Sequence, residues 1–430
     1  MLAFTLIIGL ATGAVFGLAP LLHLAPDATA TALKEGGTRT TAGAGRNRVR
    51  RGLVAVEVAL AVALVIGAGL LLRTVMNLST VDSGFNRGQL VTFAVTLPNV
   101  RYSKPELVRT FYMRLLDRLR ATAGVQSVAA MTGLPPRRRV DANDTDVEGY
   151  TPPRERPYAN VDSYNTVTTG YVETMGIPVI EGRAFQPTDA LGTTVMINQA
   201  MARMFYNLKV PWFTIVGVLK DVKQGGVDKE AGTELYFNFE QLTAVATGYV
   251  IGTMNIVIRT TQPADALSGT IRSAVAGLDP SLPIVKLRSV EDVFAEAIGR
   301  PRLLAQLLAI FGGLAILLAA IGSYGVLSYM VAERRREIGI RMALGAERQS
   351  VLGLVLAHGL GVTVAGVAGG LAIAFAMNRV LASLLFGVRP SDPATIAGVV
   401  ILMTGVGLMA CYLPARSATR VDPMIVLREE

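Results

Sequence analysis

The chain has 430 residues, of which 51% are hydrophobic and only 17% are charged. So much apolar side-chain surface with so little charge favours a membrane protein over a soluble one. The formal net charge of +9 would suit a nucleic-acid-binding protein, but the basic residues lie in short segments beside apolar runs, where they set membrane topology. We therefore expect the lipid bilayer, and no nucleic acid, as a partner.

Five apolar runs are long enough to cross a bilayer as helices, which takes roughly 20 residues. Carboxylate or imidazole side chains interrupt only two of them, with Glu57 in the second run and His358 in the fourth. Local pairing with Arg50 and Arg51 would explain Glu57, and packing between helices would explain His358. The runs are residues 1–22, 53–72, 303–329, 352–378 and 395–413.

Basic residues predict the orientation of these spans, because short cytoplasmic loops are enriched in lysine and arginine. The short connection 387–393 carries a single basic residue, Arg389, which Asp392 balances. The pattern predicts an outside amino terminus, a cytoplasmic carboxyl terminus and a large outside domain between the second and third spans. The basic residues of the other segments are Lys34, Arg39, Arg46, Arg48, Arg50 and Arg51 after the first run, Arg334, Arg335, Arg336, Arg341 and Arg348 after the third, and Arg416, Arg420 and Arg428 in the tail.

The outside domain is predicted to have a mixed α/β fold, with helices packed on a sheet. The polar stretch 135–157 is predicted to be a surface loop, and its acidic trio does not match a calcium-binding loop. The fold class is thus a membrane α-helical protein of five predicted transmembrane helices with a large extracytoplasmic mixed α/β domain. Strands are predicted at 90–97, 125–131, 194–197, 213–219, 256–260 and 284–287, and helices after Pro105 up to Gly124, at 199–205 and at 264–278.

We find no set of residues in the sequence that supports catalysis. A phosphate-binding loop is absent, so we expect no ATP hydrolysis by this chain, and any ATP to be bound by a partner subunit. The only histidines, His23 and His358, are too few and too far apart for a zinc site. We therefore expect no enzyme activity, no metal and no cofactor in this chain.

The segment 332–349 is basic and amphipathic, and it joins two apolar runs. Ile338, Met342 and Gly345 share one helical face, while Glu337 and Arg341 form an i, i+4 pair on another. Such a helix can dock on a partner protein, or it can serve only as a topology anchor. Both interpretations remain open at this point.

Small residues recur every four positions in the fourth span, at Gly361, Ala365 and Gly369. On one helix face they let a neighbouring backbone approach closely. We expect tight helix packing there, within the chain or with a partner.

Several segments resemble FtsX/MacB-type ABC transporter permeases. The stretch 333–346 resembles the signature that follows the second helix of these permeases, and the tail resembles their carboxyl terminus. The order of one helix, a large extracytoplasmic domain and three helices also matches, from about Arg46 to Glu430. The other matching segments are 413–418, 421–423 and 427–429 in the tail, and 176–178, 181–185 and 213–218 in the outside domain.

The resemblance implies a permease subunit in the bacterial inner membrane that exports or extracts a substrate. A partner ATP-binding subunit would dock on the segment 332–349, and its movement would reach the outside domain through long helices, with no substrate tunnel. The implied domains are 1–45, 46–73, 74–301 and 302–430. The implied ATPase-coupling residues are Arg335, Glu337, Ile338, Arg341, Leu344, Gly345 and Ala346.

The sequence departs from the family pattern in two places, an additional leading span and a shortened connection. Residues 13–35 align with 407–429, so residues 1–45 resemble the end of a preceding permease half, as in duplicated orphan FtsX-like permeases. This predicts a second permease half, or a second copy, as a partner. The connection 205–212 is also shorter than the family pattern.

Two other functions fit parts of this pattern. The first is a non-transporting FtsX-like regulator of extracytoplasmic enzymes, which would need extracytoplasmic protein partners. The second is an ion-coupled secondary transporter, although the inverted repeats of such proteins are not visible here.

Overall fold

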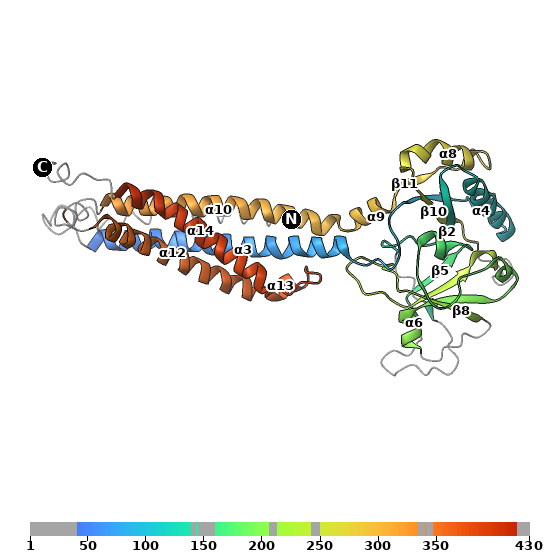
Figure 1. Cartoon of the computed structure of the whole chain (residues 1–430), viewed down its shortest axis with the longest axis horizontal. Helices are drawn as coiled ribbons and strands as arrows, with labels where there is room; N and C mark the ends of the chain where they lie inside the picture. The colour runs from blue at the N-terminus through green and yellow to red at the C-terminus, as the bar shows by residue number, and fades with distance from the viewer. Residues whose placement is uncertain are drawn as a thin grey trace. The chain divides into compact units, whose positions relative to one another are not determined.

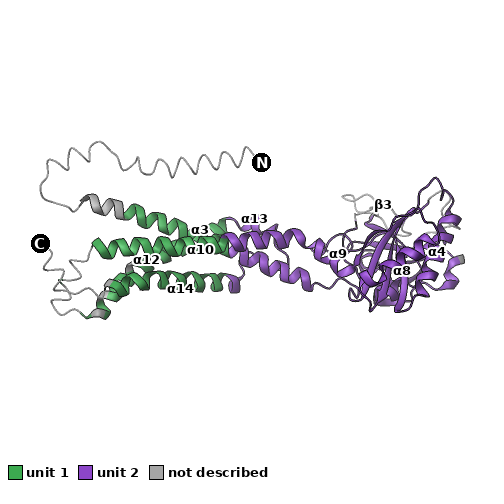
Figure 2. Cartoon of the chain, turned by 90° about the horizontal axis from the view of Figure 1, so that it is seen from above, with its two compact units in different colours: residues 1–65, 312–376, 396–430 green, residues 66–311, 377–395 purple. Residues whose placement is uncertain are grey.

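The computed structural model describes residues 41–138, 143–144, 160–205, 213–241, 250–333, 340 and 347–418. The chain divides into two compact units, which Figure 2 colours separately. The helical unit comprises residues 1–65, 312–376 and 396–430, and the sheet unit comprises residues 66–311 and 377–395.

Four long helices have the length and composition to cross a membrane. Their apolar stretches are Arg48–Thr80, Gly299–Glu333, Leu352–Ala376 and Pro393–Ser417, which correspond to the last four predicted spans. The first predicted span, residues 1–22, lies outside the described residues, so the count of five stays a prediction. The helices are α3 (Thr41–Thr80), α10 (Gly299–Glu333), α12 (Arg348–Ala376) and α14 (Pro393–Ala418), with the short α13 (Asn378–Ala382) after α12.

Within the helical unit, α3 and α10 run antiparallel and contact each other at points two turns apart on both helices. The Arg50 guanidinium lies 4.3 Å from the centre of the Tyr329 ring. Two turns further along α3, the Glu57 carboxylate lies beside Gly322, where an added Cβ atom would come within 2.5 Å of Oε2. The predicted pairing of Glu57 with Arg50 or Arg51 is not among the ion pairs of the described residues. Its carboxylate instead lies where a glycine leaves room between helices.

Helix α12 packs against two neighbours through small residues. Gly366 and Gly370 lie against α3, and an added Cβ atom at Gly370 would come within 2.5 Å of the Val62 Cβ atom. Thr363 lies against Gly407 of α14. Because glycine removes the side chain that would separate two backbones, these positions set how closely the helices approach.

The sheet unit is built on one nine-stranded sheet of mixed direction (Figure 1). Two neighbouring pairs, β5–β9 and β7–β8, are parallel, and the other neighbours are antiparallel. A separate two-stranded ladder joins β3 (Asn143–Asp144) to β4 (Asn160–Val161). The strand order is β11 (Val285–Ser289), β1 (Leu90–Thr96), β10 (Thr253–Thr260), β2 (Val125–Met131), β5 (Ser163–Val167), β9 (Glu234–Asn238), β7 (Thr194–Asn198), β8 (Thr214–Leu219) and β6 (Val179–Gly182).

Alternate residues of the strands point into two cores on opposite faces of the sheet. Phe93 and Ile256 face one core, which contains α4 and α8, while Leu90 and Val257 face the other, which contains α5 and α9. A smaller cluster holds α6 against β7 and β9. The helices are α4 (Pro105–Arg120), α5 (Tyr171–Met175), α6 (Gln199–Met204), α8 (Ala264–Ala276) and α9 (Val290–Ala297), with the short 3-10 helices η2 (Pro187–Leu191) and η3 (Phe239–Gln241).

The predicted strands and helices of this domain are confirmed, with ends that differ by a few residues. Strands β5, β6 and β9 and helices α5 and α9 were not predicted. The predicted surface loop 135–157 is wrong at its start, because Pro135 and Pro136 are buried and Arg138 donates a hydrogen bond to the Tyr164 carbonyl oxygen. The remainder, apart from residues 143–144, lies outside the described residues, as does the connection 206–212.

A buried carboxyl group lies at the centre of the sheet unit. The Glu234 side chain is 1% exposed, and its Oε2 atom accepts hydrogen bonds from Tyr236 Oη at 2.5 Å, Gln224 Nε2 at 2.9 Å and Asn165 Nδ2 at 3.0 Å. Burial raises the pKa of Glu234 to about 7, although the hydrogen bonds and the nearby Arg138 lower it in part. The group therefore titrates near neutral pH in the folded protein.

We expect the stability of the sheet unit to fall as pH rises from 5 to 8. The pKa of Glu234 is higher in the folded chain than in the unfolded chain, so its contribution is present at low pH and is lost as pH rises through about 7. Glu234→Gln should reduce this pH dependence by up to about 3 kcal/mol, measured by hydrogen exchange of β9 in the full chain. Glu173→Gln, on an exposed glutamate of α5, is the control, and equal pH profiles for the two variants would contradict the assignment.

We expect Gly370→Val to destabilise the helical unit by about 1–3 kcal/mol. The new side chain would meet the Val62 side chain and the Ala59 carbonyl oxygen, which cannot both move away. Gly361→Val on the same helix is the matched control, because no heavy atom lies within 4 Å of its added Cβ atom. Thermal unfolding of both variants in detergent tests this expectation, and equal melting temperatures would show that the contact is not tight.

Candidate functional site

The predicted ATPase-coupling segment has no described geometry. Helix α10 ends at Glu333 and α12 begins at Arg348, and between them only Ile340 and Glu347 are described, both exposed. The coupling role therefore stays a prediction from sequence. The seven predicted residues, Arg335, Glu337, Ile338, Arg341, Leu344, Gly345 and Ala346, all lie outside the described residues.

The three small residues predicted to pack in the fourth span have different surroundings. Gly361 and Ala365 are exposed, whereas an added Cβ atom at Gly369 would lie 3.4 Å from the Ala59 Cβ atom. The tightest contacts of α12 with α3 instead involve Gly366 and Gly370. Packing of Gly361 and Ala365 thus does not occur within the described chain, and it stays a prediction for contact with a partner.

A loop of the sheet unit is tied to the last turns of α3 by four polar contacts. Asn77 Nδ2 donates to the carbonyl oxygens of Phe386 at 3.4 Å and of Gly387 at 3.1 Å. The Phe386 backbone N–H donates to Thr74 Oγ1 at 3.4 Å, and Arg73 Nη1 pairs with Asp392 Oδ2 at 2.5 Å. We call Arg73, Thr74, Asn77, Phe386 and Asp392 the loop clamp.

Asp392 also starts the helix that follows this loop. Its Oδ2 atom accepts from the Thr395 backbone N–H at 2.9 Å and from Thr395 Oγ1 at 2.7 Å. These hydrogen bonds, together with Arg73, hold the pKa of Asp392 below its usual range. One carboxylate thus links the end of α3 to the beginning of α14.

Helix α9 anchors the beginning of α10 to the sheet. Ser289 and Asp292 form a capping box, in which the Asp292 backbone N–H donates to Ser289 Oγ at 3.0 Å. Phe294 is buried and contacts Phe85 edge to face at 5.7 Å. The chain then passes from α9 directly into α10, so the beginning of α10 follows a side chain that is fixed in the core.

Three segments that are distant in sequence meet in the same hydrophobic core. Leu78 from the end of α3 and Phe294 from α9 are buried in it, and Phe386 from the loop clamp packs against it. The same core contains residues of β2, β9 and β10. The three segments are thus attached to the same part of the sheet.

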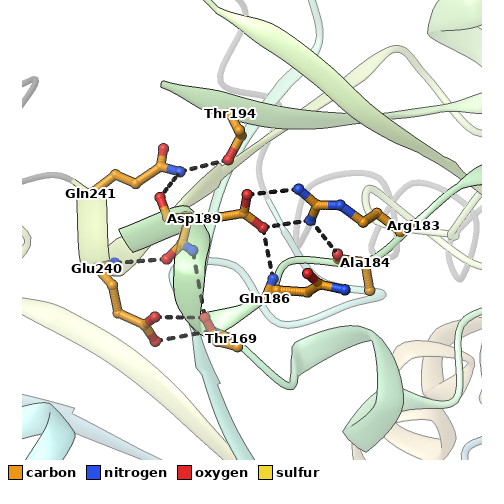
Figure 3. Close-up of polar contacts among 9 residues, drawn as sticks. Thr169, Arg183, Ala184, Gln186, Asp189, Thr194, Glu240 and Gln241 are labelled. Atoms are coloured by element: carbon orange, nitrogen blue, oxygen red, sulfur yellow. Dashed lines mark hydrogen bonds and ion pairs between the residues drawn. The ribbon is translucent and has the colours of Figure 1, made fainter. Parts of the chain in front are cut away.

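A second polar cluster braces the part of the sheet around β7 (Figure 3). Arg183 forms a two-point ion pair with Asp189, at 2.6 and 2.8 Å. Gln241 Nε2 donates to the Asp189 carbonyl oxygen and to Thr194 Oγ1, both at 2.6 Å. The ion pair holds the pKa of the Asp189 carboxyl group below its usual range. Since these groups bind each other, we assign the cluster a structural role.

A metal site is not evident in the part of the chain that the structure describes, where no three His, Cys, Asp or Glu side chains are placed to share an ion. The contacts of the loop clamp join the end of α3 to the loop before α14. The sequence analysis missed the loop clamp, because Asn77 and Phe386 have no recognisable motif. The charge pair of Arg389 and Asp392 drew attention to the loop, but the partner of Asp392 is Arg73.

Comparisons with known proteins agree on one group of membrane proteins. A family model described as a MacB-like periplasmic core domain matches residues 53–274, which is more than half of the chain. A second family model, the FtsX-like permease C-terminal domain, matches residues 309–423. Together they match residues 53–423 except for 275–308, a gap that contains β11, α9 and the beginning of α10.

Three relatives illustrate the range of similarity. An uncharacterized ABC transporter permease, YknZ of Bacillus subtilis, is 24% identical over 75% of this chain and 80% of its own length. The macrolide export ATP-binding/permease protein MacB of Bradyrhizobium diazoefficiens is 25% identical over 74% of this chain. The pyoverdine export ATP-binding/permease protein PvdT of Pseudomonas aeruginosa is 27% identical over 64% of this chain.

The chain spans 48% of the length of MacB and 43% of the length of PvdT. Those two relatives combine an ATP-binding part with a permease part, as their names state, and the family models of this chain are those of the permease part. The four apolar helices and the matched domain make it a multi-pass membrane protein with a periplasmic domain. The chain therefore belongs to the FtsX/MacB-type family of ABC transporter permeases.

Proposed function

We propose that the chain transmits ATP-driven movement from a partner ATPase to its extracytoplasmic domain, and that this movement exports or extracts a substrate. The observation that carries the proposal is the shared core, in which α3, α9 and the loop clamp each place an apolar side chain. A close-packed core moves as a body and does not absorb a displacement gradually. A pull on one helix is thus passed to the sheet.

The composition of the long helices supports this mechanism over a conduction pathway. Their apolar stretches contain few ionisable groups, and Glu57 lies against α10 at Gly322. Several close contacts between helices in the helical unit place a glycine against a valine or an alanine, as Gly366 against Val58 and Gly369 against Ala59. Such interfaces suit helices that shift as rods, whereas a substrate pathway through the membrane needs polar lining groups.

The partner ATPase would bind the segment 332–349 on the cytoplasmic side, with the amino terminus outside and the carboxyl terminus inside. Paired ATP sites would require a second permease half or a second copy of this chain. MacB and PvdT are named for export of macrolides and of pyoverdine. By analogy the substrate of this chain would be a molecule handled on the outer side of the membrane.

Binding of the ATPase should depend on one face of the coupling segment. Ile338→Asp and Met342→Asp, which lie on the same helical face, would place a charge in a contact that excludes water, and should weaken association at least about tenfold. Ile340→Asp is the matched control, because two residues along a helix turn a side chain to nearly the opposite face. Co-purification with an ATPase from the same organism measures this. If all three variants bind alike, the segment is only a topology anchor.

The loop clamp should be required for transmission. Asn77→Ala removes both hydrogen bonds to the loop backbone, and we expect it to uncouple ATP hydrolysis from transport while the chain still inserts in the membrane. Thr80→Ala on the same helix is the control, because the Thr80 hydroxyl binds only carbonyl oxygens of its own helix. Transport and ATP hydrolysis are measured with the partner ATPase in vesicles, and full coupling of Asn77→Ala would contradict the role of the clamp.

A further inference from the structure

The sheet unit contains a small pocket between the end of α3 and α9. Its volume is about 260 Å³, and its apolar lining consists of Leu78, Phe294, Ala295 and Ile298. Two charged residues of opposite sign, Arg87 and Glu291, line the same pocket. The proposed transmission mechanism uses Leu78 and Phe294 as core residues but gives no role to the charges.

The position of the pocket along the helices corresponds to the headgroup layer of a bilayer. The apolar run of α3 ends at Leu72, directly before Arg73, and that of α10 begins at Leu303, directly after Arg302. At a rise of 1.5 Å per residue, Leu78 lies about 9 Å beyond one end and Ile298 about 7 Å beyond the other. A lipid headgroup layer extends roughly 5–8 Å from the hydrocarbon boundary. The pocket therefore lies at the outer edge of that layer.

The two charges of the pocket are not neutralised by each other. Neither Arg87 nor Glu291 is in an ion pair with another described residue. The Arg87 guanidinium lies over the Phe294 ring, 4.9 Å from its centre, and this cation–π contact holds it in place. The nearby Asp82 is paired with Lys220 at 2.5 Å. A ligand that carries both charges would complete the pocket.

We propose that this pocket binds the headgroup of a zwitterionic phospholipid that bears a primary ammonium group, as in phosphatidylethanolamine. Arg87 binds the phosphate, for which a guanidinium offers several donors. Glu291 accepts hydrogen bonds from the ammonium group, and Leu78 and Ile298 contact the methylene groups of the ethanolamine. A purely anionic headgroup would meet Glu291 without a compensating charge, and a quaternary ammonium group could not donate a hydrogen bond.

The test uses the full chain in nanodiscs of phosphatidylcholine, with phosphatidylethanolamine or phosphatidylglycerol as the added lipid. Hydrogen exchange of residues 290–298 reports binding. We expect phosphatidylethanolamine to slow exchange, and Arg87→Gln and Glu291→Gln to raise the concentration needed for this about tenfold. Arg114→Gln and Glu106→Gln, both on exposed residues of α4, should behave as the unaltered chain.

Two further measurements separate this proposal from its alternatives. Arg87→Lys retains a cation for the phosphate but loses donors of the guanidinium, so it should bind more tightly than Arg87→Gln and more weakly than the unaltered chain. Soluble glycerophosphoethanolamine added to the chain in lipid-free detergent tests for a free phosphoester ligand. Equal protection by phosphatidylglycerol, unchanged binding by Glu291→Gln, binding by Arg87→Lys no tighter than by Arg87→Gln, or binding of the soluble headgroup as tight as that of the lipid would overturn the proposal.

Discussion

The arrangement of this permease depends on one hydrophobic core in the sheet unit, where three segments of the chain are held together. Leu78, Phe294 and Phe386 come from a helix end, from a helix that continues into α10 and from a loop before α14. None of the three segments can move alone without opening a cavity in the core, at a cost of some kcal/mol. The core therefore favours a few discrete positions for the helices over a continuous range.

The polar contacts of the loop clamp differ in how much they stabilise the position of the loop. The Arg73–Asp392 pair is partly exposed, with side chains that are 47% and 16% accessible, and surface ion pairs of this kind contribute little. Asn77 and Thr74 instead bind backbone groups of the loop, and Thr74 is buried. Because backbone groups do not change with the loop sequence, these contacts fix the path of the chain whatever side chains the loop carries.

The sequence was sufficient to predict the strands and helices that have a regular apolar period. It was not sufficient to predict those in which polar residues are buried. Strand β1 and helix α4 repeat apolar residues at the spacing of their type, and both were predicted. Strand β9 includes the buried Glu234 and β5 the buried Asn165, so neither shows the alternation of a half-buried strand. Asn165 Nδ2 donates a hydrogen bond to Glu234 Oε2 across the two strands, and such pairing is a tertiary property that no local pattern reveals.

Prediction from the sequence was limited in the same way for the contacts between helices and for the loop clamp. A repeat of small residues in α12 indicated close packing. A helix with two neighbours has more than one packed face, however, and the sequence does not show which small residues face which neighbour. Gly370 and not Gly361 approaches α3. Likewise, Asn77 acquires its role only because the fold brings residues 386 and 387 beside it. A motif can thus indicate a segment for which we propose a partner, whereas the contacts of the loop clamp follow only from the three-dimensional fold.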